Sequence, residues 1–459
     1  MSNRRPEQAT AEAEAFLAAN PDIENVHIVL TSINGVCRGK SLRRSEVERL
    51  YREGRLIAGS ILGLDITGAD VVETGLVWDD GDADRLLRPI PGTLVRAPWL
   101  TPPTGQVLVA PSELDGSPHP ADPRRVLARV IDRFAEMKLT PVIAIELEFY
   151  LLDRESALAG KARPPALPKT GYRPHQMQAY DLSDLEDLSP VIADIYHACD
   201  VQGLPAETVL SEYSPAQFEI VLRHRADAIR AADEAVMYKR LVKGVASKHG
   251  YEATFMAKPY TDLSGSGMHI HISLADESGT NVFAAEDPAG TPMMRHAIGG
   301  LIAAMAESVG IFAPNANSYR RFRGNSYAPI SPCWGINNRT VSVRVPAGPA
   351  ESRHIEHRVA GADANPYLAA AAALAAVHHG ITAKLDPGKP VVGNGYAIKR
   401  EPLPSNWYTA MDLTERSRFL RDYFGERFME IYCAIKRAEQ DRFFSQVTEL
   451  DFAWYLRTA

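Results

Sequence analysis

Two short alternating patterns hold the side chains best suited to chemistry. The first is Glu146-Leu147-Glu148, inside the apolar run from Pro141 to Tyr150, and the second runs from Met268 through His269 and His271 to Ser273. Successive side chains of a β-strand point to opposite faces, so the two glutamates share one face, and the two histidines share a face with Ser273. Such a strand, apolar on its other face, borders a polar cavity. Carboxylates there need a partner, and a divalent cation is the natural one.

Further acidic and basic residues recur in four clusters. They are Glu212 with Glu219 around a Ser-Pro-Ala turn, Arg320-Arg321, Asn338-Arg339 with Arg344, and the run from Arg353 to Arg358 that contains Glu356. Each pattern has a plain alternative. A lone ExE pattern more often lies on a solvated strand face, and a lone HxH pattern is more often a surface or core histidine pair. Surface arginines usually form ion pairs that contribute little to stability. The apolar flanks argue against a solvated face, because they are typical of central strands.

Taken together, the clusters predict one site. Five carboxylates (Glu146, Glu148, Glu212, Glu219 and Glu356) and His269 cannot gather without neutralisation, and about two divalent cations would balance them. Oxygen-rich ligation favours Mg²⁺ or Mn²⁺ over Zn²⁺. Arginines beside such metals suit phosphoryl groups and carboxylates, which is the general scheme of ATP-dependent activation. The sequence has no Walker A motif and no GxGxxG opening a helix, so the nucleotide must bind elsewhere than on a P-loop.

A competing metal motif can be set aside. His354-Ile355-Glu356 matches the HxE of zinc deaminases, whose chemistry also needs PCxxC downstream. Pro332-Cys333 lies upstream and lacks a second cysteine.

Composition restricts the class of protein. A chain of 459 residues has room for more than one domain, and a net charge of −7 provides no basic footprint for nucleic acid. Four scattered cysteines form no CxxC pair and favour a reduced setting, so we expect a cytoplasmic protein. The N-terminus lacks the apolar core of a signal peptide, and the alanine-rich run Leu368 to Val377 is too short to cross a bilayer. We expect neither a nucleic acid nor a membrane as partner.

Periodicity and turn residues predict the elements that position these side chains. We expect helices over 9–19, 45–53, 123–138, 190–202 and 226–249, and strands over 26–30, 36–40, 142–152, 217–222, 253–257, 269–273 and 340–345. The part from about Leu413 onward is predicted to be mostly helical. A segment rich in Pro, Gly and Ser, from Pro98 to Pro123, predicts a boundary near residue 118.

The motifs closely resemble the glutamine synthetase family. They are Thr254 to Pro259 (TFMAKP), Gly265 to His271 (GSGMHIH), Asn317 to Arg321 (NSYRR), Asn338-Arg339 with Arg344 to Pro346 (RVP), and Asn365 to Tyr367 (NPY). The resemblance covers nearly the whole chain. It implies an α+β fold with an N-terminal β-grasp domain (1–118) and a larger catalytic domain (119–459) built on a curved, largely antiparallel sheet. It also implies a double-ringed homo-oligomer, a dodecamer, with active sites shared between subunits.

The resemblance also implies a role for each matching residue. The first metal site would be Glu148, Glu212 and Glu219, and the second Glu146, His269 and Glu356. Arg321, Arg358 and the Gly265 backbone would bind glutamate. Arg339, as a catalytic residue, and Arg344 would face the transferring phosphate, and Glu207, His271 and Ser273 would contact ATP. In the implied reaction the γ-carboxylate of glutamate takes the γ-phosphoryl group of ATP, and an amine then displaces phosphate.

Two departures from the family pattern concern the amine. Glutamine synthetases carry a glutamate shortly after the Asn-Ser-Tyr stretch and an aspartate before Gly-Ser-Ser, and both contact ammonium. Here Tyr327 and Ala58 stand at these positions. A small cation loses its main source of binding in a site without these carboxylates. Two smaller departures, Ser264 for Asn and His354 for Arg, affect the glutamate and phosphate contacts.

We therefore expect a γ-glutamyl-amine ligase that uses a polyamine such as putrescine. Three alternatives remain open: a ligase for a monoamine, ethanolamine or an aromatic amine, an ammonia-using glutamine synthetase, and a non-catalytic structural relative. The last would be marked by lost metal ligands, yet all six are present. The amine itself, the base that deprotonates it and any regulation are not fixed by the sequence.

Overall fold

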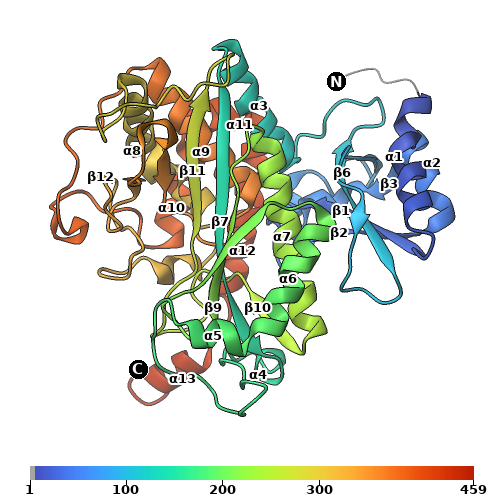
Figure 1. Ribbon diagram of the computed structural model, residues 1–459, viewed down its shortest axis with the longest axis horizontal. Coiled ribbons are helices and arrows are strands. Elements are labelled where there is room, and N and C mark those ends of the chain that lie inside the picture. The colour runs from blue at the N-terminus through green and yellow to red at the C-terminus, as the bar shows by residue number, and fades with distance from the viewer. Residues whose placement is uncertain (1–5) are drawn as a thin grey trace.

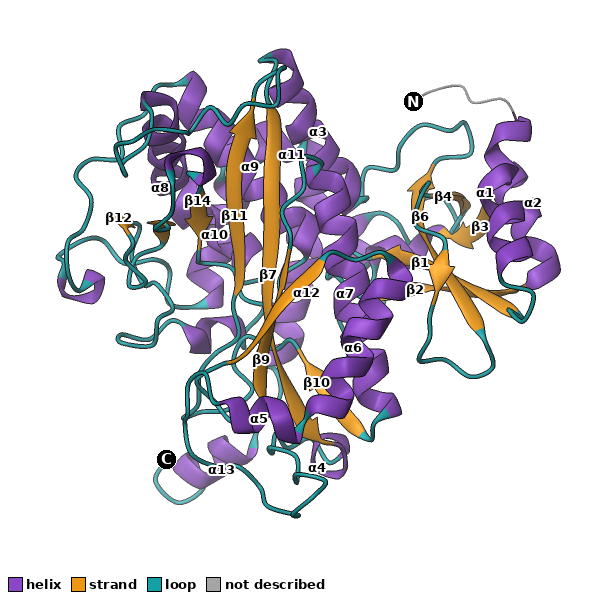
Figure 2. Ribbon diagram, in the orientation of Figure 1, coloured by secondary structure: helices purple, strands orange, loops and turns teal. Residues whose placement is uncertain are grey.

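The structure is a computed structural model that describes residues 6–459, and its strands form two separate sheets. Figure 1 shows the smaller sheet with the two N-terminal helices on one side of the molecule, and Figure 2 shows the larger sheet embedded among the remaining helices. Among the described residues, no helix has both the length and the apolar character that crossing a membrane requires.

The smaller sheet follows the order β2-β1-β6-β4-β3, with β5 paired to β6. Its strands are β1 (Asn25–Thr31), β2 (Cys37–Arg43), β3 (Arg55–Ala58), β4 (Asp84–Pro89), β5 (Val95–Arg96) and β6 (Thr104–Ser112). The predicted hairpin around Asn34-Gly35 joins β1 to β2, and Gly35 has the positive φ that this turn requires. The strand β6 lies parallel to β1 in the middle of the sheet, and helices α1 (Pro6–Ala19) and α2 (Val47–Glu53) accompany it. This arrangement is the β-grasp.

The larger sheet follows the order β12-β13-β14-β11-β7-β9-β8, with β10 also paired to β7. Its strands are β7 (Thr140–Asp153), β8 (Ala206–Ser211), β9 (Gln217–Leu222), β10 (Tyr251–Thr254), β11 (Met268–Ala275), β12 (Trp334–Ile336), β13 (Val343–Val345) and β14 (Ile355–His357). Every pairing is antiparallel except that of β12 with β13. The long strand β7 is the centre of this sheet.

The remaining helices follow the smaller sheet in the sequence. They are α3 (Pro123–Glu136), α4 (Arg154–Leu158), α5 (Leu182–Asp187), α6 (Ser189–Gln202), α7 (Ala228–Lys248), α8 (Pro292–Phe312), α9 (Pro366–Thr382), α10 (Trp407–Arg416), α11 (Arg418–Phe424), α12 (Glu426–Phe444) and α13 (Glu449–Tyr455). Helices α3 and α7 pack on β7, and α9 packs on β11 and against α8. The alanine-rich run lies in α9 and is buried along its whole length. Small side chains let α8 and α9 approach closely, so this layer forms a dense core behind the sheet.

Most predicted elements are present, with shifted ends. The predicted strand 253–257 is observed earlier as β10, and only the last part of the strand 340–345 is extended, as β13. Helices begin at Trp407, several residues before the predicted start of the helical C-terminal part. The strand β14 was not predicted, although it carries Glu356.

Candidate active site

The alternation of β7 separates a helix-covered face from a polar face. Ile145, Leu147 and Phe149 are each about 1% exposed and lie against the helices, whereas Glu146 and Glu148 point to the other face. The strand β11 pairs with β7 so that His269 lies directly opposite Glu146. Side chains of directly opposed residues stand on the same face of a sheet. The predicted faces of both strands are therefore confirmed by the backbone register.

Neighbouring strands extend this polar face into a continuous row. Glu356 on β14 lies opposite His271 on β11, and Arg344 on β13 lies opposite Glu356. On the other side of β7, Glu219 on β9 lies opposite Glu148. Five adjacent strands thus bring residues 146, 148, 219, 269, 271, 344 and 356 onto one surface.

One end of the row, which we call the paired half, consists of Glu146, His269 and Glu356 with Arg344 and Arg358. The Nδ1 atom of His269 lies 2.6 Å from a Glu146 oxygen and 3.6 Å from a Glu356 oxygen. Arg344 donates to Glu356 at 2.9 Å, and Arg358 donates to the other Glu356 oxygen. Each carboxylate of this half therefore has a cationic or histidine partner from the protein.

These partners control the pKa values in the paired half. Burial alone would raise the pKa of Glu146, but hydrogen bonds from His269 and His271 hold it well below its ordinary value. Burial likewise opposes the charge of Glu356, yet Arg358 and the histidines lower its pKa to about 2. Burial, together with Arg358, lowers the pKa of His269. The carboxylates are thus ionised and His269 is neutral at pH 7, which is the state in which both residue types bind metals.

The other end of the row, the crowded half, consists of Glu148, Glu212 and Glu219. Glu148 accepts hydrogen bonds from the Gly267 amide at 2.9 Å and from Gln217 at 3.3 Å. Burial and the charge of Glu212 raise the pKa of Glu148 to about 8, and burial with Glu146 and Glu148 raises that of Glu219 to about 11. Burial and Glu146 also raise the pKa of Glu212. Like charges that lie this close oppose one another's ionisation.

The donor set fits divalent cations. Ligand atoms of Glu146, His269 and Glu356 all lie within 4.8 Å of one another, as do those of Glu148, Glu219 and His269. The first group is the predicted second metal site, and the other contains two of the three residues predicted for the first, with Glu212 close enough to raise their pKa values. Oxygen donors with one imidazole suit Mg²⁺ or Mn²⁺. A cation in the crowded half would remove the repulsion that raises these pKa values.

A glycine loop connects the row to the predicted glutamate-binding arginines. A Cβ atom on Gly265 would lie 2.9 Å from the Arg321 side chain, and one on Gly267 would lie 2.8 Å from both Arg321 and His269. Only glycine permits this approach. Arg321 is 6% exposed and donates to the Val359 carbonyl at 2.8 Å, and Arg358 is 4% exposed. Both arginines are therefore held rigidly beside the carboxylate row.

The remaining predicted residues lie at different distances from the row. Arg344 is part of it, and Arg339, an exposed turn residue, is close enough to Glu212 to lower the pKa of that carboxyl. His271 lies 3.2 Å from Glu146, and Ser273 follows on the same face of β11. Glu207, by contrast, is exposed at the start of the edge strand β8 and pairs with Arg223 at 2.6 Å. The predicted nucleotide contacts therefore spread from the centre of the sheet to its edge.

The structure adds contacts for three further residues near the site. Gln217 donates to Glu148 and to the Gly265 carbonyl, and it stands on the face of β9 that also carries Glu219. His354 lies 3.1 Å from His271. Tyr213, the residue after Glu212, faces Tyr327. The alternation Gln217-Phe218-Glu219 was a usable sequence signal for the first, whereas the contacts of His354 and Tyr213 depend on the fold.

Tyr213 and Tyr327 form an aromatic pair beside the crowded half. Their ring centroids are 5.4 Å apart and their hydroxyl oxygens 3.4 Å apart. Tyr327 has a φ of 58°, which is uncommon for a bulky residue and is concentrated at functional sites. The rings are 40% and 47% exposed, so a ligand can reach them. The sequence comparison with the family singled out Tyr327 alone, and the structure adds Tyr213 as a second aromatic ring.

The fold and this site define the class of the protein. The family profile described as "Glutamine synthetase, catalytic domain" matches residues 120–455. The chain belongs to the glutamine synthetase family, and the predicted family and fold class are confirmed.

Individual relatives are similar over nearly their full length. γ-Glutamylputrescine synthetase PuuA of Escherichia coli (strain K12) is 39% identical over 456 residues, which cover 99% of this chain and 96% of PuuA. Glutamate–isopropylamine ligase of Pseudomonas sp is 33% identical over 444 residues, 95% of each chain. The solved GmaS/ADP complex superposes with a TM-score of 0.84 at 30% identity, over 97% of this chain and 99% of GmaS.

Proposed function

We propose that the protein is an ATP-dependent ligase that joins the γ-carboxylate of glutamate to an amine, with a polyamine such as putrescine as the amine. The observation that carries this proposal is the row itself: five of the six predicted metal ligands and Arg344 stand on one face of the larger sheet, and Glu212 is close enough to raise the pKa of Glu148. Family membership and the names of the two relatives support the same reaction class. A complete site argues against a non-catalytic relative.

The chemistry follows in two steps. An oxygen of the glutamate γ-carboxylate attacks the γ-phosphorus of ATP, and the bond to ADP breaks. The amine nitrogen then attacks the resulting acyl phosphate and releases inorganic phosphate. We assign Arg321 and Arg358 to the glutamate carboxylates, and Arg339 and Arg344 to the transferring phosphoryl group, because guanidinium matches both geometries. Mg²⁺ or Mn²⁺, about two per site, would supply charge neutralisation to the phosphates when held by the carboxylate row.

The aromatic pair supports an alkyl amine over ammonia. Ammonium needs nearby carboxylates, whereas the rings of Tyr213 and Tyr327 offer apolar surface for a carbon chain. A distal ammonium beside an aromatic face gains about 0.5–2 kcal/mol. A diamine therefore suits these walls, since one nitrogen attacks uncharged while the other remains charged.

We further propose a homo-oligomer, a dodecamer, with shared sites. Ala58 ends β3 in the smaller sheet, which Figure 2 shows on the side of the molecule away from β14. An Ala58 loop that contributes to an active site would have to do so in a neighbouring subunit. The division into a domain of residues 1–118 and one of 119–459 fits the separation of the two sheets. The four cysteines are all free, which supports a cytoplasmic location.

An amine screen tests the proposed reaction. Phosphate release is measured at fixed ATP, Mg²⁺ and glutamate with putrescine, spermidine, isopropylamine, ethanolamine and ammonia. We expect putrescine or a longer polyamine to exceed ammonia in kcat/KM by at least about tenfold, or roughly 1.4 kcal/mol. If ammonia is the better substrate, the amine-ligase proposal fails. If only monoamines or ethanolamine react, the ligase chemistry stands and the polyamine assignment fails.

Two variants test whether the aromatic pair determines the preference for the amine. Tyr327→Glu restores an anion and should narrow the gap between putrescine and ammonia, while Tyr213→Ala should raise the putrescine KM more than the glutamate KM. Tyr172→Glu is the matched control, because this tyrosine is 51% exposed and pairs with His175 rather than with a residue of the row. An unchanged preference in both variants would remove the aromatic pair from the amine site.

Sedimentation of the active enzyme tests the assembly. We expect activity to sediment only with the oligomer and isolated subunits to be inactive. Activity that sediments as a monomer would contradict shared sites.

A further inference from the structure

One cavity lies away from the carboxylate row. It measures about 1180 Å³, and no residue of the predicted catalytic site lines it. Its walls come from the β1–β2 turn, from α7 and α12, and from the segment 315–317. Helix α7 packs against the apolar face of β7, where Tyr238 meets Phe149 at 6.4 Å between ring centroids. The cavity therefore lies on the helix-covered side of the larger sheet.

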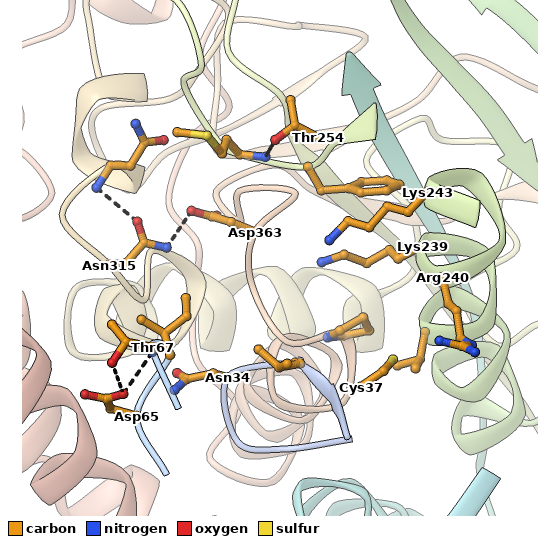
Figure 3. A pocket seen from close by; sticks show the side chains of 18 of the residues that line it. Asn34, Cys37, Asp65, Thr67, Lys239, Arg240, Lys243, Thr254, Asn315 and Asp363 are labelled. Atoms are coloured by element: carbon orange, nitrogen blue, oxygen red, sulfur yellow. Dashed lines mark hydrogen bonds between the residues drawn. The ribbon is translucent and has the colours of Figure 1, made fainter. Parts of the chain in front are cut away.

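Two lysines of α7 converge on this cavity. Figure 3 shows the ammonium groups of Lys239 and Lys243 extending side by side toward Asp363. Their Nζ atoms lie 5.3 Å and 5.9 Å from the centroid of the same Phe255 ring. Burial and the neighbouring Lys243 lower the pKa of Lys239 to about 8. The two ammonium groups thus repel each other in a partly buried environment.

The other charges around the cavity are largely compensated. Arg442 pairs with Asp65 at 2.7 Å, and Glu439 pairs with Lys436 at 3.0 Å. No carboxylate among the described side chains lies within ion-pair distance of Lys239 or Lys243. Asp363 lies beyond that distance but is near enough to raise the pKa of Lys239, so the positive charge of the α7 wall is only partly compensated.

The cavity also offers apolar surface and one free acceptor. Trp99, Phe255 and Trp407 are among its lining residues. One oxygen of Asp363 accepts from Ser318 at 2.7 Å, while the other, Oδ1, is buried without a hydrogen-bond partner in the described structure. Such an acceptor needs a donor, and convergent lysines need an anion.

We propose that this cavity is a second ligand site, separate from the reaction site, for an organic anion that carries a carboxylate or phosphate group on an apolar body. The anionic group would bind Lys239 and Lys243, the body would pack on Phe255 and Trp99, and a hydroxyl or N–H group would reach Asp363. The proposal does not depend on the amine or on the ligase reaction.

Calorimetric titration of the full enzyme tests the proposal. The enzyme is first saturated with ADP, Mg²⁺ and glutamate, so that probes cannot bind at the reaction site. Benzoate and phenyl phosphate are the anionic probes, which separate carboxylate from phosphate chemistry, and benzyl alcohol is the neutral control. We expect at least one anionic probe to bind about tenfold or more tightly than benzyl alcohol.

Variants connect the binding to the lysines. Lys243→Met should weaken binding of the preferred probe about tenfold or more, because the lost ammonium makes no other polar contact in the described structure. Lys239→Met should do the same, although Lys239 also donates to the Ala362 carbonyl at 2.7 Å. Lys138→Met is the matched control, since Lys138 is exposed and pairs with Glu277. Equal affinity for benzoate, phenyl phosphate and benzyl alcohol, absence of binding at millimolar concentration, or full binding by Lys243→Met would overturn the proposal.

Discussion

The paired half and the crowded half of the carboxylate row solve the same electrostatic problem in opposite ways. In the paired half, Arg344 and Arg358 neutralise Glu356, and its pKa falls to about 2. In the crowded half no arginine contacts Glu148 or Glu219 among the described residues, and their pKa values rise to about 8 and about 11. The difference teaches that one half is organised by the protein before any cation binds, whereas the other depends on the cation for its charge balance.

Removal of the metals should eliminate the activity of the enzyme, since both halves of the row are expected to bind them. We expect complete loss of turnover in excess chelator and recovery with Mg²⁺ or Mn²⁺, because both donor groups face the same substrate-binding surface. Glu148→Ala and Glu356→Ala should each abolish turnover as well. The measurement is phosphate release, with circular dichroism as the control for folding. Full activity in chelator would refute the two-metal hypothesis.

Neutralising single carboxylates should have opposite effects on the stability of the two halves. Glu356→Gln leaves Arg344 and Arg358 without their carboxylate at 12% and 5% side-chain exposure, and should cost about 3–5 kcal/mol of unfolding free energy. Glu219→Gln replaces a carboxyl whose raised pKa makes it take up a proton on folding, so it should leave the metal-free protein equally or more stable. Urea unfolding in chelator measures both. Equal destabilisation by the two variants would mean that the two halves do not differ in how their charges are balanced.

The contacts of Gln217 should affect metal binding in the crowded half alone. Its amide donates to Glu148 at 3.3 Å and to the Gly265 carbonyl at 3.1 Å, so it orients a predicted ligand. Gln217→Met should raise the Mg²⁺ concentration for half-maximal activity by about 10–100-fold, as is usual when the support of a ligand is lost. Gln202→Met is the control, because this buried glutamine donates to the Arg96 carbonyl, remote from the row. An unchanged Mg²⁺ requirement would remove Gln217 from the site.

The pH dependence of the metal-free protein should show the same difference between the two halves. Glu148 has a higher pKa folded (about 8) than its ordinary value of 4.5, so its contribution to stability is present below pH 4.5 and is lost as pH rises toward 8. Glu356 has a lowered pKa (about 2), so its contribution is present above pH 4.5 and is lost as pH falls toward 2.

Between pH 4.5 and 8, therefore, Glu148 should lower the unfolding free energy by at most about 1.4 kcal/mol per pH unit. Urea unfolding in chelator across this range measures the slope, and Glu148→Gln should make it shallower. Saturating Mg²⁺ should abolish the decline, because the cation binds the deprotonated carboxylates. A slope that is identical in wild type and variant would contradict the raised pKa.

The strands that carry the row differ in how well the sequence predicts them. The strands β7 and β11 are long and alternate strictly, so their polar faces could be identified from period alone. The strand β14 has only three residues, all buried, and its identity depends on pairing with β11 and β13. Local sequence contains little information on such a strand, because its stability comes from its neighbours.

The same limit applies to the site. The five carboxylates and His269 could be grouped into one site from their clusters in the sequence, and the family resemblance divided these six residues into two metal sites. The pairing of Tyr213 with Tyr327 joins residues 114 positions apart, and the convergence of Lys239 and Lys243 on Asp363 requires a helix and a distant loop. Contacts between segments that far apart follow from the topology of the sheet and its helices, which a single sequence does not display.

The strict alternation of β7 has a consequence for misfolding. A slip of β7 by one residue against β11 would turn Glu146 and Glu148 toward the helices and Leu147 toward the polar face. Two carboxylates would then enter an apolar core without partners, at a cost of several kcal/mol each. The residues that we assign to the reaction are thus also the residues that forbid the wrong register. A chain that folds with the correct strand register therefore also places the carboxylate row correctly, because a register error in the sheet would displace the row.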